Sequence, residues 1–101
     1  MEHRWGERIL MDVPVRLRCA GSRTTVAGQL CELSISGALV SMAVPLPRAA
    51  RVDVDLAGGL VPAWIVRQDE GSIAVEWCEL APAPVVALEN DARQFRRQWV
   101  A

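Results

Sequence analysis

The chain of 101 residues contains no lysine and no tyrosine, and it has a single histidine, His3. Its three cysteines, Cys19, Cys31 and Cys78, are odd in number and stand at none of the spacings typical of zinc fingers or redox motifs. These shortages give no support to a zinc site or a Cys–His nucleophile pair. We therefore expect buried, reduced thiols, no metal and no cofactor.

Long apolar runs are absent as well. No segment approaches the ~20 apolar residues that a bilayer-crossing helix needs, and the charged start MEHRWGER is unlike a secretory signal. The length suits one compact domain. We expect a cytoplasmic protein that does not insert into a membrane.

Alternation of apolar and polar residues is the main pattern that is present. Residues 9–19 alternate clearly, and Ala20-Gly21-Ser22 then predicts a turn. Further short strands are expected at 24–33, 38–42, 51–56, 60–68 and 73–78, separated by polar, glycine or proline breaks. This pattern of about six short antiparallel strands is typical of a small barrel or sandwich, and we predict a mostly β fold, a six-stranded antiparallel barrel spanning residues 9–78.

Individual residues refine this prediction. Pro14 suggests an edge position or a bulge, and Gly28 suggests a bulge or a close backbone approach. Trp64 and Trp77 are expected in the core.

The last part of the chain follows a different period. Apolar residues recur at spacings of three and four, which predicts one stripe of an amphipathic helix over residues 84–100: Val85, Leu88, Ala92, Phe95 and Trp99. We expect this stripe to dock on the barrel. Residues 1–8 are expected to form a flexible arm.

Two short motifs flank the first predicted hairpin. Arg4 and Arg8 form an RxxxR pattern before the first strand, and Glu32, Ser34 and Gly37 follow the second strand. Because the hairpin turns near residue 21, residue i should face about residue 42 − i, which places Arg8 opposite Ser34. The two motifs are therefore expected to meet at the open end of the hairpin.

The chemistry of this group suits a guanine nucleotide. Arginine can donate two hydrogen bonds to guanine O6 and N7 or bind a phosphate, and a carboxylate can accept from the N1–H and N2–H₂ edge. Gly37 is expected to allow close backbone approach and a positive φ. Backbone N–H groups around Ser36 and Gly37 are expected to form an anion-binding nest.

On these motifs the sequence resembles the PilZ domain family. The family pattern is RxxxR followed, one hairpin later, by [DN]xSxxG; Arg4, Arg8, Ser34 and Gly37 match it, and Glu32 stands where the family has Asp or Asn. The segment Gly71 to Trp77 also resembles the family's last strand, with an aromatic that closes the barrel. The resemblance implies a split barrel and a cyclic di-GMP site formed by Arg4, Arg8, Glu32, Ser34 and Gly37.

The resemblance also implies a non-catalytic adaptor that changes conformation with ligand and regulates a partner protein in motility, attachment or exopolysaccharide pathways. The alternative is a degenerate scaffold of the same fold that binds no nucleotide and acts through protein contacts; Glu32 favours it. Single-stranded nucleic acid is not expected as a ligand, because the net charge is −1. The sequence shows no acid–base pair of the kind that would indicate an enzyme, so no catalytic activity is expected. We expect a monomer or a weak dimer.

Overall fold

The computed structural model describes residues 8–19 and 21–99, with side chains as far as Gln94. Of the arm predicted over residues 1–8, Arg8 falls within this range, whereas Arg4 lies outside the described residues. The side chains of Phe95 and Trp99, two members of the expected helical stripe, also lie outside the description.

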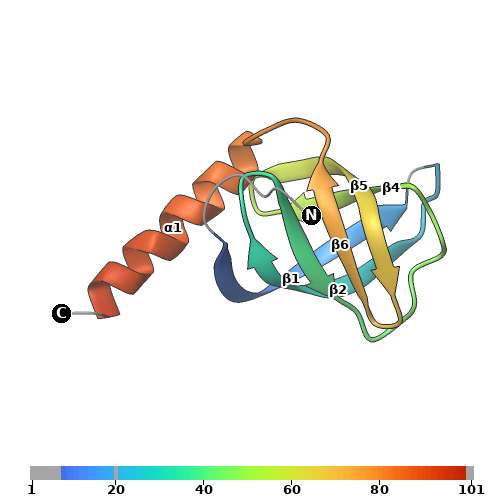
Figure 1. Cartoon of the computed structure of the whole chain (residues 1–101), viewed down its shortest axis with the longest axis horizontal. Helices are drawn as coiled ribbons and strands as arrows, with labels where there is room; N and C mark the ends of the chain where they lie inside the picture. Colours follow the sequence, from blue (N-terminus) through green and yellow to red (C-terminus); the bar gives the residue numbers. More distant parts are fainter. Residues whose placement is uncertain (1–7, 20, 100–101) are drawn as a thin grey trace.

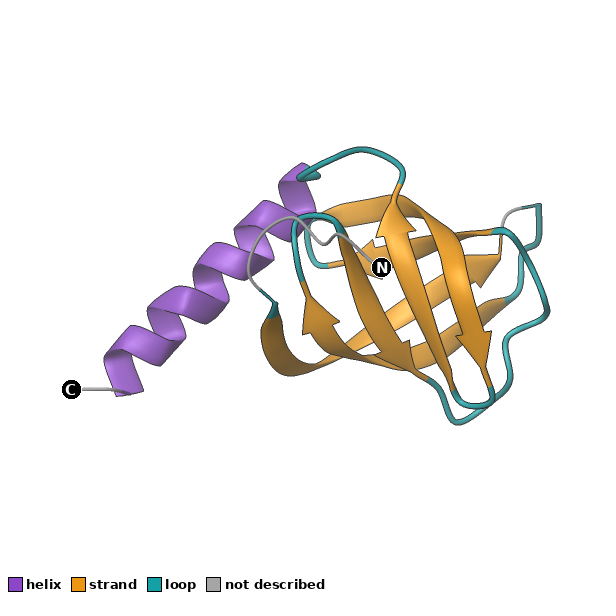
Figure 2. Ribbon diagram, in the orientation of Figure 1, coloured by secondary structure: helices purple, strands orange, loops and turns teal. Residues whose placement is uncertain are grey.

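Six antiparallel strands form a closed barrel in the order β1-β2-β3-β6-β5-β4, and one helix follows them (Figures 1 and 2). The elements are β1 (Ile9–Cys19), β2 (Thr25–Leu33), β3 (Gly37–Ser41), β4 (Arg51–Leu56), β5 (Gly59–Asp69), β6 (Ser72–Trp77) and α1 (Ala83–Trp99). The predicted strands therefore form, within one or two residues of their expected bounds, and the predicted barrel is confirmed.

Alternation along each strand builds the core. Successive side chains of a strand point to opposite faces, so every second residue enters the barrel. In β1, Val15, Leu17 and Cys19 are buried, and the intervening Arg16 and Arg18 are exposed. The interior is filled by similar aliphatic side chains from the other strands, among them Leu30, Val40, Val54, Val61, Ile73 and Val75.

Pro14 and Gly28 both lie in the regular part of the β1–β2 pairing, and the bulge of this hairpin falls between Leu10 and Val13 instead. Pro14 lies in the part of β1 that pairs only with β2, because pairing with β4 runs from Arg16 to Cys19. A missing N–H is tolerated on such an open side. A Cβ on Gly28 would stand 2.8 Å from Cγ1 of Val40, so the predicted close approach is confirmed.

Trp64 departs from the sequence-based expectation, whereas Trp77 agrees with it. Trp77 is 4% exposed, but Trp64 is 46% exposed. In β5 the inward positions belong to Val61 and Ala63, which leaves Trp64 on the outer face. The prediction that Trp64 lies in the core is wrong because strand parity, and not the apolar character of the side chain, selects the face.

The three cysteines also differ in burial, and only part of the sequence-based expectation holds for them. All three are free; Cys19 is buried, Cys31 is half-buried and Cys78 is exposed. Burial raises the pKa of the Cys19 thiol. The expectation of buried thiols therefore holds for Cys19 and is wrong for Cys78, which follows the last strand at the surface.

Helix α1 begins beside the barrel and runs away from it (Figure 1). Pro84 occupies its first turn, where the missing N–H costs nothing. Val85 is fully buried in the core cluster and Leu88 packs against that cluster, so the first turns of the predicted stripe are docked. Within the part of the chain that the structure describes, no helix is long and apolar enough to cross a bilayer.

Candidate functional site

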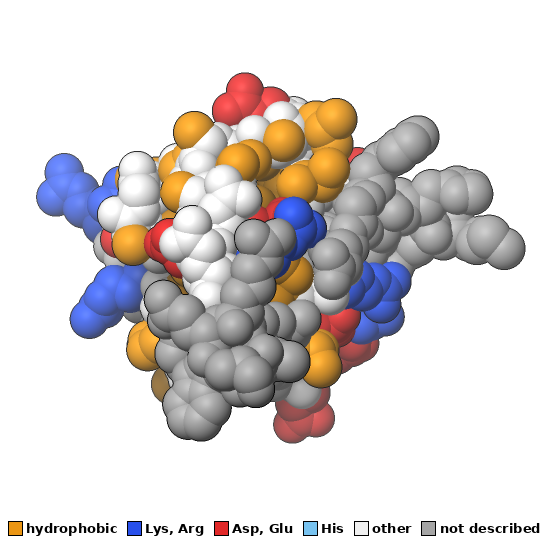
Figure 3. Space-filling model, turned by 90° about the vertical axis from the view of Figure 1, so that its left-hand side faces the viewer, with side chains coloured by type: hydrophobic (Ala, Val, Ile, Leu, Met, Phe, Trp, Pro, Cys, Tyr) orange, Lys and Arg blue, Asp and Glu red, His pale blue; other side chains and the backbone are white. Residues whose placement is uncertain are grey.

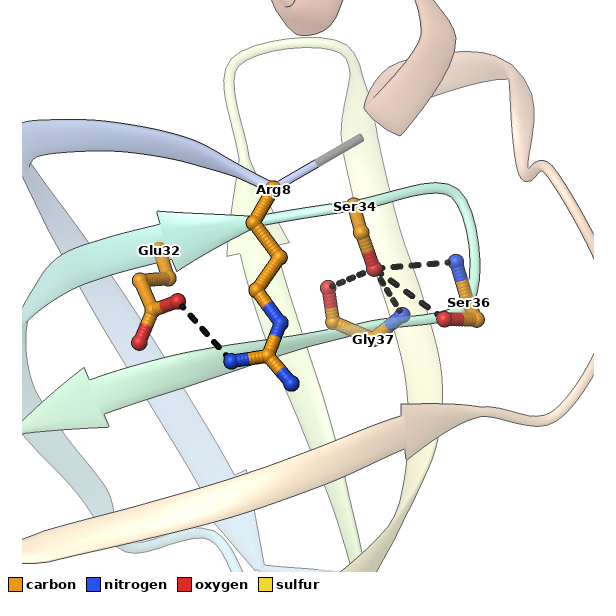
Figure 4. A network of polar contacts seen from close by, with 5 residues as sticks. All are labelled: Arg8, Glu32, Ser34, Ser36 and Gly37. Atoms are coloured by element: carbon orange, nitrogen blue, oxygen red, sulfur yellow. Dashed lines mark hydrogen bonds and ion pairs between the residues drawn. The ribbon is translucent and has the colours of Figure 1, made fainter. Parts of the chain in front are cut away.

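The first hairpin brings the two sequence motifs together. Ile9 pairs with Leu33 and Leu10 pairs with Glu32, which is the predicted register. Arg8 precedes β1, and its Nη1 lies 3.7 Å from Oε1 of Glu32 (Figure 4). The side chains are 50% and 21% exposed, respectively, so the pair is open to solvent. The predicted meeting of Arg8 with the second motif is thus present.

Apolar side chains flank this ion pair. Glu32 pairs with Leu10 of β1 on one side and with Leu39 of β3 on the other. Leu10 is 70% exposed, an unusual position for a large aliphatic residue in a strand. Sequence reasoning did not single out Leu10, although it has the same strand parity as the outward-facing Asp12 and Arg16, and that signal was available.

Ser34 holds a tight corner between β2 and β3 (Figure 4). It is only 1% exposed. Its Oγ accepts hydrogen bonds from the N–H groups of Ser36, at 3.3 Å, and Gly37, at 3.2 Å. The Gly37 carbonyl accepts from the Ser34 N–H at 2.9 Å. The predicted anion nest is therefore wrong, because the Ser34 hydroxyl already takes both N–H groups.

Gly37 is required by packing and not by its backbone angle. A Cβ at this position would overlap the carbonyl oxygen of Val75 on the adjacent strand β6. Its φ is not positive, unlike that of Gly21, Gly59 and Gly71. The predicted close approach is confirmed and the predicted positive φ is wrong, since Gly37 already belongs to the extended strand β3.

The same corner is tied to the end of the barrel and to the segment before α1. The Nε1–H of the buried Trp77 donates to the Ser34 carbonyl at 3.0 Å. The backbone N–H of Trp77 donates to Ser36 O at 2.9 Å, and that of Ala81 donates to Ile35 O at 3.0 Å. The carbonyl groups of Ser34, Ile35 and Ser36 thus anchor the segment from Trp77 to Ala81 that leads into the helix.

Charge at the surface is mixed. On the face shown in Figure 3, the described arginine and acidic side chains are interspersed and form no extended patch of one sign. Among the described residues there is also no group of three or more His, Cys, Asp and Glu side chains placed to hold a metal ion. The chemistry that the described residues offer is a solvent-exposed guanidinium beside a carboxylate, flanked by Leu10 and Leu39.

Such a group can recognise a planar, polar ligand. The guanidinium has several N–H donors and can bind guanine O6 and N7 or a phosphate, while the carboxylate can accept from guanine N1–H and N2–H₂. The exposed Leu10 and the half-buried Leu39 offer an apolar surface for the face of a base.

Comparison with known proteins shows the family and the fold of the chain. The family model described as PilZ domain matches residues 2–94. The structure is similar to the crystal structure of the PilZ domain of CeSA from a cellulose-synthesizing bacterium, with a TM-score of 0.67 and 24% identity over 90% of this chain and 99% of that one. It is also similar to the PilZ domain of YcgR from Escherichia coli, solved with c-di-GMP, with a TM-score of 0.64 and 14% identity over 95% and 98% of the two chains.

These two structural likenesses, at such low identity, concern the fold alone. The comparison with curated proteins found no match.

Proposed function

Because the chain belongs to the PilZ domain family, whose members are ligand-binding and not catalytic domains, we propose that it binds cyclic di-GMP at the surface around Arg8 and Glu32. The observation that carries the proposal is the juxtaposition of these two side chains on the first hairpin. Arg4 completes the site in the proposal, as its place in the RxxxR motif implies. Ser34 and Gly37 contribute by holding the corner beside the ligand.

The proposed output is regulation of a partner protein by a cytoplasmic adaptor. Ligand that engages Arg8 and Glu32 acts two residues from the corner whose hydrogen bonds hold Trp77 and Ala81. A shift of this corner would change the approach to α1, and a ligand that binds one arrangement better shifts the population toward it. Motility, attachment or exopolysaccharide synthesis are the pathways that the family membership suggests.

Removal of either arginine tests the site. Arg8→Ala and Arg4→Ala should each weaken cyclic di-GMP binding by about 1–3 kcal/mol, or about 5- to 150-fold, because each removes charged hydrogen bonds to guanine or phosphate. Isothermal titration calorimetry measures this, with the exposed Arg23→Ala as the matched control. Equal affinity of wild type and both variants would place the site elsewhere.

A degenerate scaffold without ligand binding is the second candidate, and the Arg8–Glu32 pair favours it. In the structure the carboxylate faces Arg8 at 3.7 Å, so the guanidinium already has a partner of opposite charge that competes with a ligand. If this ion pair prevents ligand binding, wild type should show no heat of binding with cyclic di-GMP. Glu32→Asp should then restore binding, because the shorter side chain releases the Arg8 guanidinium.

A further inference from the structure

The outer face of the barrel opposite the first hairpin carries an ordered row of three side chains. Arg51 of β4 pairs with Trp64 of β5, and Trp64 pairs in turn with Glu76 of β6. All three are exposed. The Arg51 guanidinium lies over the Trp64 ring, 5.0 Å from its centre. The row therefore places a positive, an aromatic and a negative side chain next to one another on three neighbouring strands.

An apolar stripe crosses this row along β5. Leu60 is 51% exposed, Trp64 46% and Val66 49%. Val66 stands at a bulge, because Ile65 pairs with Val75 and Arg67 pairs with Ala74. Arg67 at the end of the stripe is already paired with Asp69, at 3.1 Å. Exposed tryptophan and arginine are the residues most enriched among those that dominate protein interfaces.

The topology restricts how a partner can bind here. β5 is paired with β4 on one side and with β6 on the other, so it offers no free edge for an added strand. A partner must therefore pack face to face on the outer surface, as one sheet packs on another.

The opposite charges at the two ends of the row, Arg51 and Glu76, suit a second copy of this chain as the partner. Consider a two-fold axis that lies in the interface and runs along β5. It places Leu60, Trp64 and Val66 over the same residues of a second copy, and it exchanges the two ends of the row. Arg51 of each copy then faces Glu76 of the other. An isologous interface requires such self-complementarity, and we propose that this face, centred on Trp64, is the homodimer interface of the protein.

The proposed interface is separate from the nucleotide surface. In the closed barrel order, β5 is three strands away from β2, which carries Glu32, in either direction around the barrel. Dimerisation through β5 therefore leaves Arg8 and Glu32 uncovered, and the dimer proposal can fail or succeed independently of cyclic di-GMP binding.

Charge reversal tests the proposal directly. Arg51→Glu makes both ends of the row acidic, and Glu76→Arg makes both ends basic, so each variant alone should repel its own copies. Mixed one to one, the acidic and basic variants present opposite charges at both ends and should form a heterodimer. Sedimentation equilibrium of the full chain measures the association, with Arg23→Glu and Asp91→Arg as charge-matched controls away from this face.

The expected results are a concentration-dependent dimer for wild type and for both controls, and at least about tenfold weaker association for Arg51→Glu, Glu76→Arg and Trp64→Ala. The mixture should recover association close to that of wild type. A wild type that stays monomeric up to about 1 mM, where even a 4 kcal/mol interaction would be detected, overturns the proposal. Single variants that associate like wild type, or a mixture that recovers nothing, also overturn it.

Discussion

At the scale of single residues, the chemistry of the site depends on the length of one side chain. Glu32 stands on the outer face of β2 and reaches the guanidinium of Arg8 at 3.7 Å. The aspartate or asparagine of the family pattern is one methylene shorter and would hold its oxygen closer to the strand. In the proposed complex the carboxylate would therefore have two competing partners, the neighbouring arginine and the guanine of the ligand.

Substitution of Glu32 separates these roles. If the carboxylate contacts guanine, Glu32→Ala should weaken cyclic di-GMP binding by about 1–3 kcal/mol, as for a lost charged hydrogen bond, and Glu32→Asp should bind equally well or better. Both variants should keep the stability of wild type within about 1 kcal/mol, because exposed ion pairs contribute little. Calorimetric titration and urea unfolding measure the two effects, and unchanged binding by Glu32→Ala would exclude the contact.

Gly37 is a residue whose role is packing. Gly37→Ala should destabilise the domain by about 1–3 kcal/mol or more, because the added methyl overlaps the Val75 carbonyl and forces β3 away from β6. Ser36→Ala, its neighbour in the same corner, should cost less than about 1 kcal/mol. Urea unfolding monitored by tryptophan fluorescence compares the two, and an equal, small loss for both would contradict the steric account.

At the scale of elements, the strands could be predicted because β1 and β4 alternate clearly and the strands are separated by short turns. The predicted register of the first hairpin holds at its open end, where Ile9 faces Leu33, but from Val13 to Arg18 the pairing is shifted by one residue, and the bulge between Leu10 and Val13 had no signal in the turn. The orientation of Trp64 could not be predicted, because residues 60–66 are all apolar and the sequence does not show which parity faces the core. The bonding of Ser34 could not be predicted either, since it depends on three hydrogen bonds within one corner. The direction of α1 away from the barrel also has no local signal, because the same stripe would suit a helix docked along its whole length.

The docking of α1 on the barrel can be tested by substitution of two adjacent valines. Val85 is fully buried in the core, whereas Val86 is only half-buried. Val85→Ala should lower the free energy of unfolding by about 2 kcal/mol through lost methyl burial and the cavity left behind, and Val86→Ala should lower it by clearly less. Equal losses in chemical denaturation would show that the first turn of the helix is not docked as described.

At the scale of the whole molecule, the barrel separates two surfaces by half its circumference. The first hairpin carries Arg8 and Glu32, and the outer face of β5 carries the Arg51–Trp64–Glu76 row. The corner at Ser34 to Gly37 links the first surface to α1 through Trp77 and Ala81. Sequence motifs alone indicated the first surface, but the row became visible only once the register placed β4, β5 and β6 side by side.

One calorimetric titration of the full chain decides whether this domain binds cyclic di-GMP as proposed. We expect saturable heat with cyclic di-GMP and much weaker or no binding of GMP, GTP and cyclic di-AMP, because Arg8 and Glu32 together require guanine edges in a ligand that also carries phosphates. Absence of any heat of binding for wild type at ligand concentrations near 100 μM, which would already detect an interaction of about 5–6 kcal/mol, would contradict it.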